Sequence, residues 1–285
     1  MARAFTVLGL AGLSLAGTSS PKRGLIYIPS DAHPEDDAIW TQAGSSLTWY
    51  YNYGSQPSDA FAHLSQEQFE FVPMMWGINK DDPGETKWLD EVTAAIDGGR
   101  DIKHVLAFNE PDGPAEWGGS DIDPDMAAKA WVANFEPLAE RGVKLGLPAV
   151  TGAPTGLTWL QDFLAACEEV LGRECTFDFV PVHWYDNFGG LTSHIDERRS
   201  IWPDKEIWPT EYAYAHRTLE ESQEYYNQTA EKFDSEASIG KYSYFGAFRS
   251  DVSNVGPNAT FLSAGGELTD IGSWYLGFDA TGVIP

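Results

Sequence analysis

Two glutamates, each placed where an apolar segment ends, are the residues of this sequence best suited to chemistry. Glu110 follows the apolar run 105–108 and precedes Pro111, and Glu211 closes the apolar segment that begins at residue 206. Because Pro111 cannot donate to a sheet ladder and favours an extended residue before it, we expect Glu110 to be extended, in the last residue or two of a buried strand. Two carboxyl groups at strand ends predict acid/base chemistry on a sugar, since cleaving a glycosidic bond needs one carboxyl as proton donor and a second at the anomeric carbon.

The run Asn-Glu-Pro-Asp at residues 109–112 also has a purely structural interpretation. Taken alone, it is equally typical of a turn that Asp112 caps. The second glutamate at the end of a later strand favours the catalytic interpretation, because opposing strands of one barrel can bring their ends together across its mouth.

Polar and aromatic residues near the two glutamates are candidates for substrate contacts. Asn109 is placed to hydrogen-bond a sugar hydroxyl, and Tyr212 or a neighbouring aromatic residue could orient Glu211. His183 ends another apolar segment, where it could bond Glu211 or a sugar hydroxyl, although buried histidines that bond the backbone are common. Five further aromatic residues at predicted strand ends are candidate platforms for pyranose rings, with packing as an equal alternative for the first three: Tyr51, Trp76, Trp117, Trp184 and Tyr185.

The elements that must position these residues alternate along the chain. Apolar segments predict eight strands, at residues 24–29, 47–53, 71–76, 103–109, 143–148, 177–184, 206–210 and 242–248. Helix signals occur at 34–43, 85–96, 125–141, 158–171, 219–233 and 268–276, with less distinct helices expected in 54–70 and 189–202. This alternation predicts an α/β fold, a single-domain (β/α)8 TIM barrel. An open doubly wound sheet is the alternative, but no glycine-rich phosphate loop follows the first strand.

The composition fits one large domain and argues against some partners. The chain has 285 residues, 42% of them hydrophobic, with 18 Lys plus Arg against 43 Asp plus Glu and a formal net charge of −25. This charge disfavours nucleic acid and anionic membranes as partners but does not repel a neutral polymer. The motifs His-Glu-x-x-His, Cys-x-x-Cys and Gly-x-Ser-x-Gly are absent from the sequence, so nothing proposes a metal or a cofactor. We expect a monomer.

The first twenty residues have the features of a secretory signal peptide. Residues 1–20 combine a basic start, an apolar run too short to span a bilayer and the small residues that a signal peptidase prefers, which leaves 21–285 as the domain of a secreted, extracellular or cell-wall protein. An oxidising compartment would allow Cys167 and Cys175 to form a disulfide, with two separate thiols as the alternative. Two Asn-x-Thr sequons predict N-glycosylation at Asn227 and Asn258.

Three runs of residues resemble glycoside hydrolase family 128, a group of β-1,3-glucanases within clan A. They are Phe-Asn-Glu-Pro-Asp at 108–112, Val-His-Trp-Tyr at 182–185 and Trp-Pro-Thr-Glu-Tyr-Ala at 208–213, and the resemblance extends from residues 22–24 to 268–276. The Asn-Glu pair is shared throughout the clan, whereas the His-Trp-Tyr run and the last segment narrow the resemblance to the family. Pro209 departs from the family, which often has Leu or Phe there, and this proline could shift the strand end that carries Glu211.

The resemblance implies a retaining mechanism with Glu110 as general acid/base and Glu211 as nucleophile. It also implies β-1,3-glucan as the substrate, which we expect to be cleaved internally. Two alternatives stay open. One is a clan A enzyme for another β-linked polymer such as mannan or cellulose, and the other is a cell-wall protein that binds β-1,3-glucan oligosaccharides on the same barrel without hydrolysing them.

Overall fold

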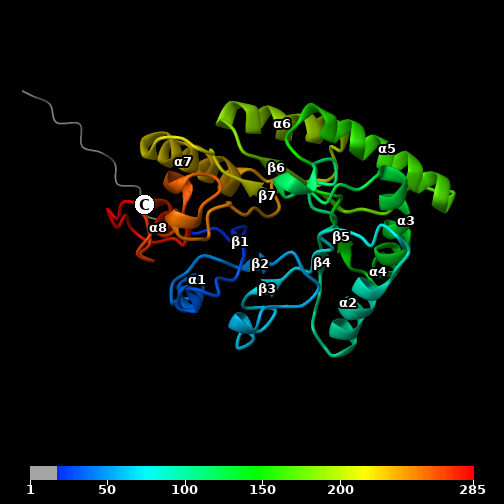
Figure 1. Ribbon diagram of the computed structural model, residues 1–285, viewed down its shortest axis with the longest axis horizontal. Helices are drawn as coiled ribbons and strands as arrows, with labels where there is room; N and C mark the ends of the chain where they lie inside the picture. The colour runs from blue at the N-terminus through cyan, green and yellow to red at the C-terminus, as the bar shows by residue number, and fades with distance from the viewer. Residues whose placement is uncertain (1–17) are drawn as a thin grey trace, which may run out of the picture.

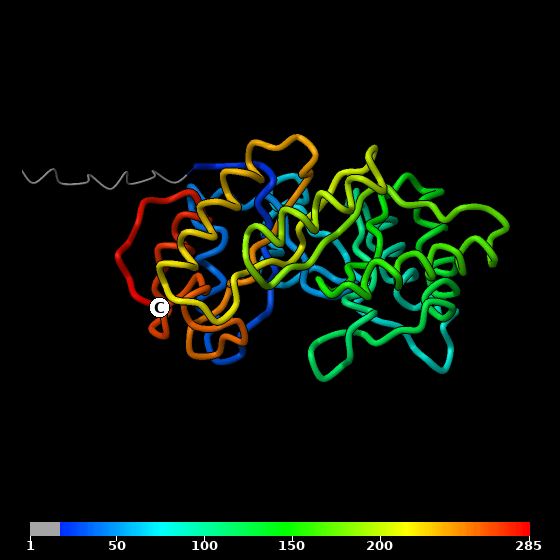
Figure 2. Tube along the Cα trace, turned by 90° about the horizontal axis from the view of Figure 1, so that it is seen from above, coloured from blue at the N-terminus to red at the C-terminus, as the bar shows by residue number. Residues whose placement is uncertain are grey.

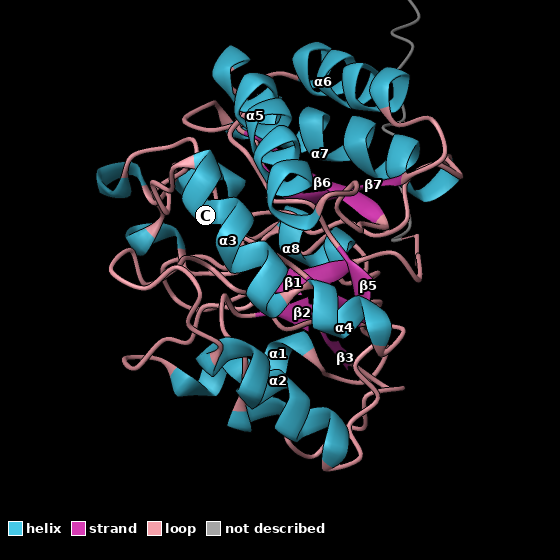
Figure 3. Ribbon diagram, turned by 90° about the vertical axis from the view of Figure 1, so that its right-hand side faces the viewer, coloured by secondary structure: helices cyan, strands magenta, loops and turns pink. Residues whose placement is uncertain are grey.

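The computed structural model of the chain describes residues 18–285, in which short strands occupy the centre and helices surround them (Figure 1, Figure 3). The predicted signal peptide, residues 1–20, lies outside the described residues except for 18–20. Within 18–285, no helix combines the length and the apolar character needed to cross a membrane.

All pairings between the named strands are parallel. β1 (Gly24–Ile26), β2 (Trp49–Tyr51) and β3 (Glu70–Phe71) form one sheet, β4 (His104–Val105) pairs with β5 (Lys144–Leu145), and β6 (Phe179–Trp184) pairs with β7 (Glu206–Tyr212). Parallel strands connected by helices make this an α/β fold, as the sequence predicts. Most of the strands are shorter than predicted, and 242–248 forms no named strand.

Isolated parallel bridges connect these small sheets to one another. The bridges join the segments of successive strands, and the last of them returns from residue 242 to the residue before β1: Met74–Leu106, Gly146–Phe179, Tyr212–Tyr244 and Arg23–Tyr242. The segment predicted as the eighth strand therefore contacts both the seventh and the first.

Eight α-helices lie within the described residues. They are α1 (Asp37–Trp40), α2 (Lys87–Asp97), α3 (Pro124–Asn134), α4 (Glu136–Glu140), α5 (Pro154–Leu171), α6 (Phe188–Ile201), α7 (Leu219–Ser235) and α8 (Asp270–Tyr275). Local signals explain several of their ends. Asp123 caps α3 by accepting from the amide of Asp125, and Thr218 and Glu221 form a reciprocal capping box at the start of α7. Gly172 ends α5 in the left-handed conformation.

Two helix predictions are corrected by the structure. The helix predicted over 125–141 is broken at Phe135, because Pro137 has no amide hydrogen for the helical bond and instead opens the first turn of α4. The connection 54–70 contains no α-helix, only the short 3₁₀ turn Asp59–Phe61. In contrast, the other less distinct helix, predicted within 189–202, is present as α6.

Large aromatic side chains from separate strands meet in the centre of the fold. Phe179 on β6 stacks on Trp208 of β7 with ring centroids 3.9 Å apart, and Trp49 of β2 lies 5.6 Å from Trp208. Because side chains alternate along a strand, these residues define which positions of each strand point inward. Tyr51 lies two positions after Trp49 on β2, so its side chain also points inward.

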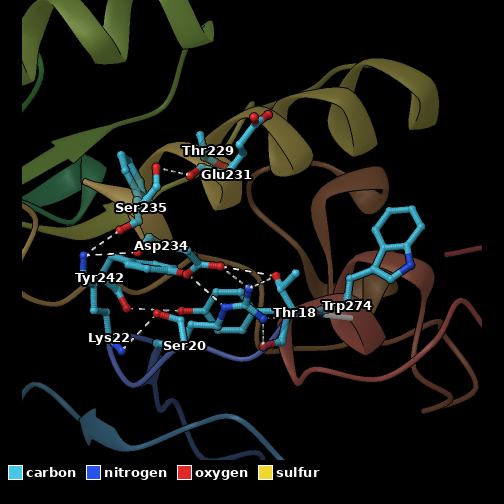
Figure 4. A network of polar contacts seen from close by, with 12 residues as sticks. Thr18, Ser20, Lys22, Thr229, Glu231, Asp234, Ser235, Tyr242 and Trp274 are labelled. Atoms are coloured by element: carbon cyan, nitrogen blue, oxygen red, sulfur yellow. Dashed lines mark hydrogen bonds and ion pairs between the residues drawn. The ribbon is translucent and has the colours of Figure 1, made fainter. Parts of the chain in front are cut away.

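A buried arginine ties the two ends of the domain together. Arg23, just before β1, has no exposed surface and forms a 2.7 Å ion pair with Asp234 of α7, a bond to the Tyr242 hydroxyl and a bond to the Trp274 carbonyl of α8. Asp234 and Tyr242 point toward one another in Figure 4, and the first described residues run beside the C-terminal segment in Figure 2. The network closes the fold where its first and last segments meet.

The predicted disulfide is present. Cys167 of α5 and Cys175 in the following loop are joined, with their Cα atoms 5.9 Å apart. The bond fixes the end of α5 to the segment that leads into β6.

We expect replacement of Asp234 by Asn to destabilise the fold strongly. Loss of one member of a buried ion pair leaves the other charge without compensation, which typically costs about 3–5 kcal/mol. Urea unfolding should therefore show a fall of that size in the free energy of unfolding for Asp234→Asn. Glu231→Gln is the matched control on the same helix, because the Glu231 side chain is exposed and forms no ion pair with a described residue; equal stability of the two variants would contradict the assigned role of Arg23.

Candidate active site

Glu211 reaches the centre of the fold through a β-bulge in β7. Val182 pairs with Pro209 and His183 pairs with Glu211, so Thr210 is an extra residue without a partner on β6. Pro209 explains the position of the bulge, because it cannot donate to the ladder. Without the extra residue, Glu211 would lie on the opposite face from the inward-pointing Trp208. The bulge reverses the alternation and turns the Glu211 side chain inward.

Glu110 adopts a left-handed backbone conformation. Its φ is +42°, and its amide donates to the carbonyl of Ala149 at 2.7 Å. The prediction of an extended residue is therefore wrong, although the preference imposed by Pro111 is real. A turn closed by the bond from the Gly113 amide to the Glu110 carbonyl, 2.8 Å long, overrides that preference.

The two glutamates and His183 come together at one point. One carboxylate oxygen of Glu110, one of Glu211 and one ring nitrogen of His183 all lie within 4.8 Å of one another. His183 Nδ1 is 3.0 Å from Oε1 of Glu110 and 3.5 Å from Oε2 of Glu211. His183 thus bridges the pair, whereas the sequence suggested a contact with Glu211 or with a sugar hydroxyl and did not include Glu110. The same donor set could hold a divalent metal ion.

Three tyrosine hydroxyls surround the carboxylate of Glu211, a residue that is only 4% exposed. Tyr185 donates to Oε2 at 2.5 Å and Tyr53 donates to Oε1 at 2.7 Å. Tyr51 lies 3.4 Å from Oε1 and donates more closely to the Thr210 carbonyl, at 3.0 Å. The carboxylate is therefore held at both oxygens.

Burial, neighbouring charges and hydrogen bonds together shift the pKa values of the side chains in this cluster. Burial raises the pKa of Glu211, and the Glu110 charge raises it further, while His183 and the tyrosine hydroxyls oppose the rise. Burial alone would lower the pKa of His183, but the charges of Glu211 and Glu110 outweigh burial and raise it. Burial and the Glu211 charge also raise the pKa values of Tyr53 and Tyr185 well above the usual range, so both remain hydrogen-bond donors.

A cavity of about 640 Å³ opens over the two glutamates. Four of the residues predicted to contact a substrate line it: Asn109, Tyr185, Trp76 and Trp117. The side chains of Trp76 and Trp117 are 39% and 78% exposed, so their rings are available to a ligand. Asn109 donates through Nδ2 to the Gly118 carbonyl, whereas its buried Oδ1 has no partner among the described residues.

Two predicted contact residues point away from the cavity. Trp184 follows the inward-pointing His183 and so turns outward, where its ring packs against His194 of α6. The bulge likewise turns Tyr212 outward, against Phe233 of α7. The neighbouring aromatic residues that contact Glu211 are Tyr51, Tyr53 and Tyr185.

Several residues of this site were not predicted from the sequence. Tyr53 is the most important, and a signal for it exists, because positions 49, 51 and 53 share one face of an extended chain. Phe245, from the segment predicted as the eighth strand, and Val255, from the chain that follows it, also line the cavity. No local pattern distinguishes those two residues from ordinary core residues.

Comparison with known proteins identifies relatives of this chain. A family model described as glycosyl hydrolase catalytic core matches residues 24–275. An endo-β-1,3-glucanase of glycoside hydrolase family 128, subgroup II, from Pseudomonas viridiflava is 26% identical, with a TM-score of 0.73 over 93% of this chain and 100% of that one. A curdlan-specific exo-β-1,3-glucanase of subgroup III from Blastomyces gilchristii, in complex with glucose, is 28% identical, with a TM-score of 0.68 over 92% and 99% of the two chains.

Two further relatives have different descriptions. An oligosaccharide-binding protein of subgroup VII from Cryptococcus neoformans shares the fold, with 22% identity and a TM-score of 0.66 over 92% of this chain and 96% of that one. The alkali-sensitive linkage protein 1 of Schizosaccharomyces pombe is 30% identical over 267 residues, which make up 90% of this chain and 44% of the relative. This chain therefore spans less than half of that curated relative.

We expect the pKa of His183 to fall when Glu110 is replaced by Gln. The substitution removes a negative charge and a charge-assisted hydrogen bond from an imidazole that burial already disfavours in its charged form. NMR titration of the imidazole Cε1–H signals, assigned with His183→Gln, would measure the shift. An unchanged pKa of His183 would contradict the proposed effect of the Glu110 charge on His183.

Proposed function

Since this chain belongs to the glycosyl hydrolase catalytic core family, and within it to glycoside hydrolase family 128, we propose that it hydrolyses β-1,3-glucan by a retaining mechanism. The observation that carries this proposal is the approach of one oxygen of Glu110 and one of Glu211 to within 4.8 Å. Retaining glycosidases hold their carboxyl groups about 5–5.5 Å apart, whereas inverting enzymes need about 6.5–9.5 Å to admit a water molecule between the general base and the anomeric carbon.

In this mechanism Glu211 is the nucleophile and Glu110 is the acid and then the base. Glu211 attacks the anomeric carbon while Glu110 protonates the departing glycosidic oxygen, which leaves a covalent glycosyl-enzyme. Glu110 then takes a proton from water, and the resulting hydroxide displaces Glu211. Tyr53 and Tyr185 support these roles, because both hydrogen bonds to Glu211 favour its ionised form.

A neutral glucan is the substrate that the cavity favours. The net charge of −25 disfavours polyanionic ligands, and the exposed rings of Trp76 and Trp117 suit the apolar faces of pyranose units. The unpartnered Oδ1 of Asn109 is an acceptor for a sugar hydroxyl. Two of the most similar solved structures are named as β-1,3-glucanases, one endo-acting and one exo-acting.

Three finer features belong to the same proposal. The strands form a (β/α)8 barrel, for which the support is the succession of parallel contacts that returns from Tyr242 to Arg23. The enzyme cleaves the glucan at internal bonds. Trp76 and Trp117 support this proposal, because they come from different loops and can contact glucosyl units on either side of the bond that is cut. The protein acts as a monomer.

Export is a further part of the proposal. The composition of residues 1–20 and the disulfide between Cys167 and Cys175 both suit a secreted protein of the extracellular space or cell wall. N-glycosylation is proposed at Asn227, on α7, and at Asn258, whose Nδ2 donates to the Arg217 carbonyl at 2.8 Å.

A second candidate function is binding of glucan oligosaccharides without hydrolysis. It is favoured by the similarity in fold to the oligosaccharide-binding protein of subgroup VII. An assay of reducing sugar distinguishes the two functions. A protein that only binds glucan would bind laminarioligosaccharides but release no reducing sugar during long incubation.

We expect Glu110→Gln and Glu211→Gln each to lower the turnover of laminarin by several orders of magnitude, with thermal unfolding close to that of the wild type. Each amide keeps the shape of the side chain but cannot exchange a proton or form the covalent intermediate. With an aryl β-laminarioside, whose leaving group departs without protonation, added azide should restore turnover and give a β-glycosyl azide with the Glu110 variant and an α-glycosyl azide with the Glu211 variant. Near-normal turnover in both variants would refute the assignment, and inactivity of the wild type towards laminarin would favour the binding function.

We expect the acid limb of the pH profile of kcat/KM to lie above pH 4.5, the ordinary pKa of a glutamate. Glu211 must be ionised to attack, and its pKa is raised, so activity is lost as the pH falls through that raised value. Tyr53→Phe removes a donor to the carboxylate, which raises the pKa further and moves the limb to higher pH. Tyr50→Phe, on the opposite face of β2, is the control. If the acid limb lies at the same pH in both variants, Tyr53 does not stabilise the ionised form of Glu211.

A further inference from the structure

A second cavity opens beside the one that holds the two glutamates. Its volume is about 330 Å³, and Tyr53 and Trp76 line both cavities. The walls of the second cavity are otherwise formed by the chain after β2 and β3 and by the first turns of α2. The two cavities are therefore neighbours along one continuous surface.

Tyr53 forms the partition between the two cavities. Its hydroxyl donates to Glu211, while the residues that follow it, Gly54 and Ser55, belong to the wall of the second cavity. The backbone of Tyr53 has a φ of +62°, an uncommon value for a residue with a side chain. A chain that leaves the reacting centre across the Trp76 ring arrives in the second cavity.

The lining of the second cavity combines an aromatic face with fixed hydrogen-bonding groups. Trp76 supplies the exposed ring, and Asn79 and Glu91 supply an amide and a carboxylate. Oε2 of Glu91 accepts from the Ser55 hydroxyl, which orients the carboxylate and leaves Oε1 for another donor. An apolar face with a few placed polar groups is typical of a site for a small neutral ligand.

Charge narrows the class of ligand further. The lining contains the carboxylates of Asp82, Glu85 and Glu91 against the single ammonium group of Lys87. An anionic ligand would be repelled, whereas the hydroxyls of a neutral sugar can donate to the carboxylates. The cavity volume and its position next to the glutamates fit one more unit of the same polysaccharide.

We propose that the second cavity is a subsite that binds a further glucosyl unit of the β-1,3-glucan chain cut between Glu110 and Glu211. The proposal rests on the proposed function for the identity of the chain. Contacts made with a unit remote from the reacting bond can be used to orient the substrate and lower the barrier. Oligosaccharides long enough to enter the second cavity are therefore cleaved with higher kcat/KM than shorter ones.

The test compares kcat/KM for laminarioligosaccharides of increasing length with the full-length mature protein and two variants. Glu91→Ala removes the carboxylate from the cavity, and Asp90→Ala is the matched control, because Asp90 lies on the same helix, is exposed and does not line the cavity. We expect the ratio of kcat/KM between long and short substrates to fall roughly tenfold in Glu91→Ala, the size expected for a hydrogen bond to a charged group. The ratio should be unchanged in Asp90→Ala.

A binding measurement separates this inference from the proposed function. Calorimetric titration of laminarioligosaccharides into Glu211→Gln, with and without Glu91→Ala, reports on the subsite in the absence of turnover. Weaker binding of only the longer oligosaccharides in the double variant supports the subsite even if the wild type proves not to hydrolyse glucan. Equal length dependence with and without Glu91, in both rate and binding, would overturn the subsite while leaving the hydrolase assignment intact.

Discussion

Burial of the Glu211 carboxylate is the constraint on which the site depends. A buried charge is tolerated only when hydrogen bonds and opposite charge replace the lost water. Here Tyr53 and Tyr185 donate to the two oxygens, and His183 supplies a ring nitrogen between Glu211 and Glu110. Tyr53 follows β2, whereas His183 and Tyr185 lie at the end of β6, so the carboxylate on β7 is satisfied only when β2, β6 and β7 are in register. The catalytic carboxylate can therefore be accommodated only in a correctly assembled fold.

The bulge at Thr210 allows Glu211 to point into the centre of the fold. Strand alternation sends Trp208 inward, to stack on Phe179, and would send Glu211 outward. The extra residue lets β7 contribute both an aromatic to the core and a carboxylate to the cavity within four positions. The bulge also frees the Thr210 carbonyl, which accepts from the hydroxyls of Tyr51 and Ser243 and is thereby not left unpaired.

The limits of prediction from sequence follow from the same geometry. The α/β class, the disulfide and the meeting of Glu110, Glu211 and His183 could be anticipated, because apolar periodicity and strand-end polar residues are local signals. The outward direction of Trp184 could have been read from its neighbour His183, since consecutive strand residues face opposite ways. The direction of Tyr212 could not, because it depends on a bulge. The left-handed conformation of Glu110 likewise could not, because the turn closed by Gly113 and the long-range bond from the Glu110 amide to the Ala149 carbonyl override the effect of Pro111.

The residues with unfavourable backbone conformations at the site lie apart from the buried ion pair that stabilises the fold. Glu110 and Tyr53 both have positive φ values, which a side chain makes costly, and both belong to the cavity. Close packing enforces the turn at Glu110, since a Cβ on Gly119 would lie 2.2 Å from the Gly113 carbonyl oxygen, so only glycine fits there. The buried network of Arg23 and Asp234 lies among β1, α7 and α8, away from these residues. A scaffold closed by such a network can hold two unfavourable backbone conformations in place, and the groups they carry are then oriented before any ligand arrives.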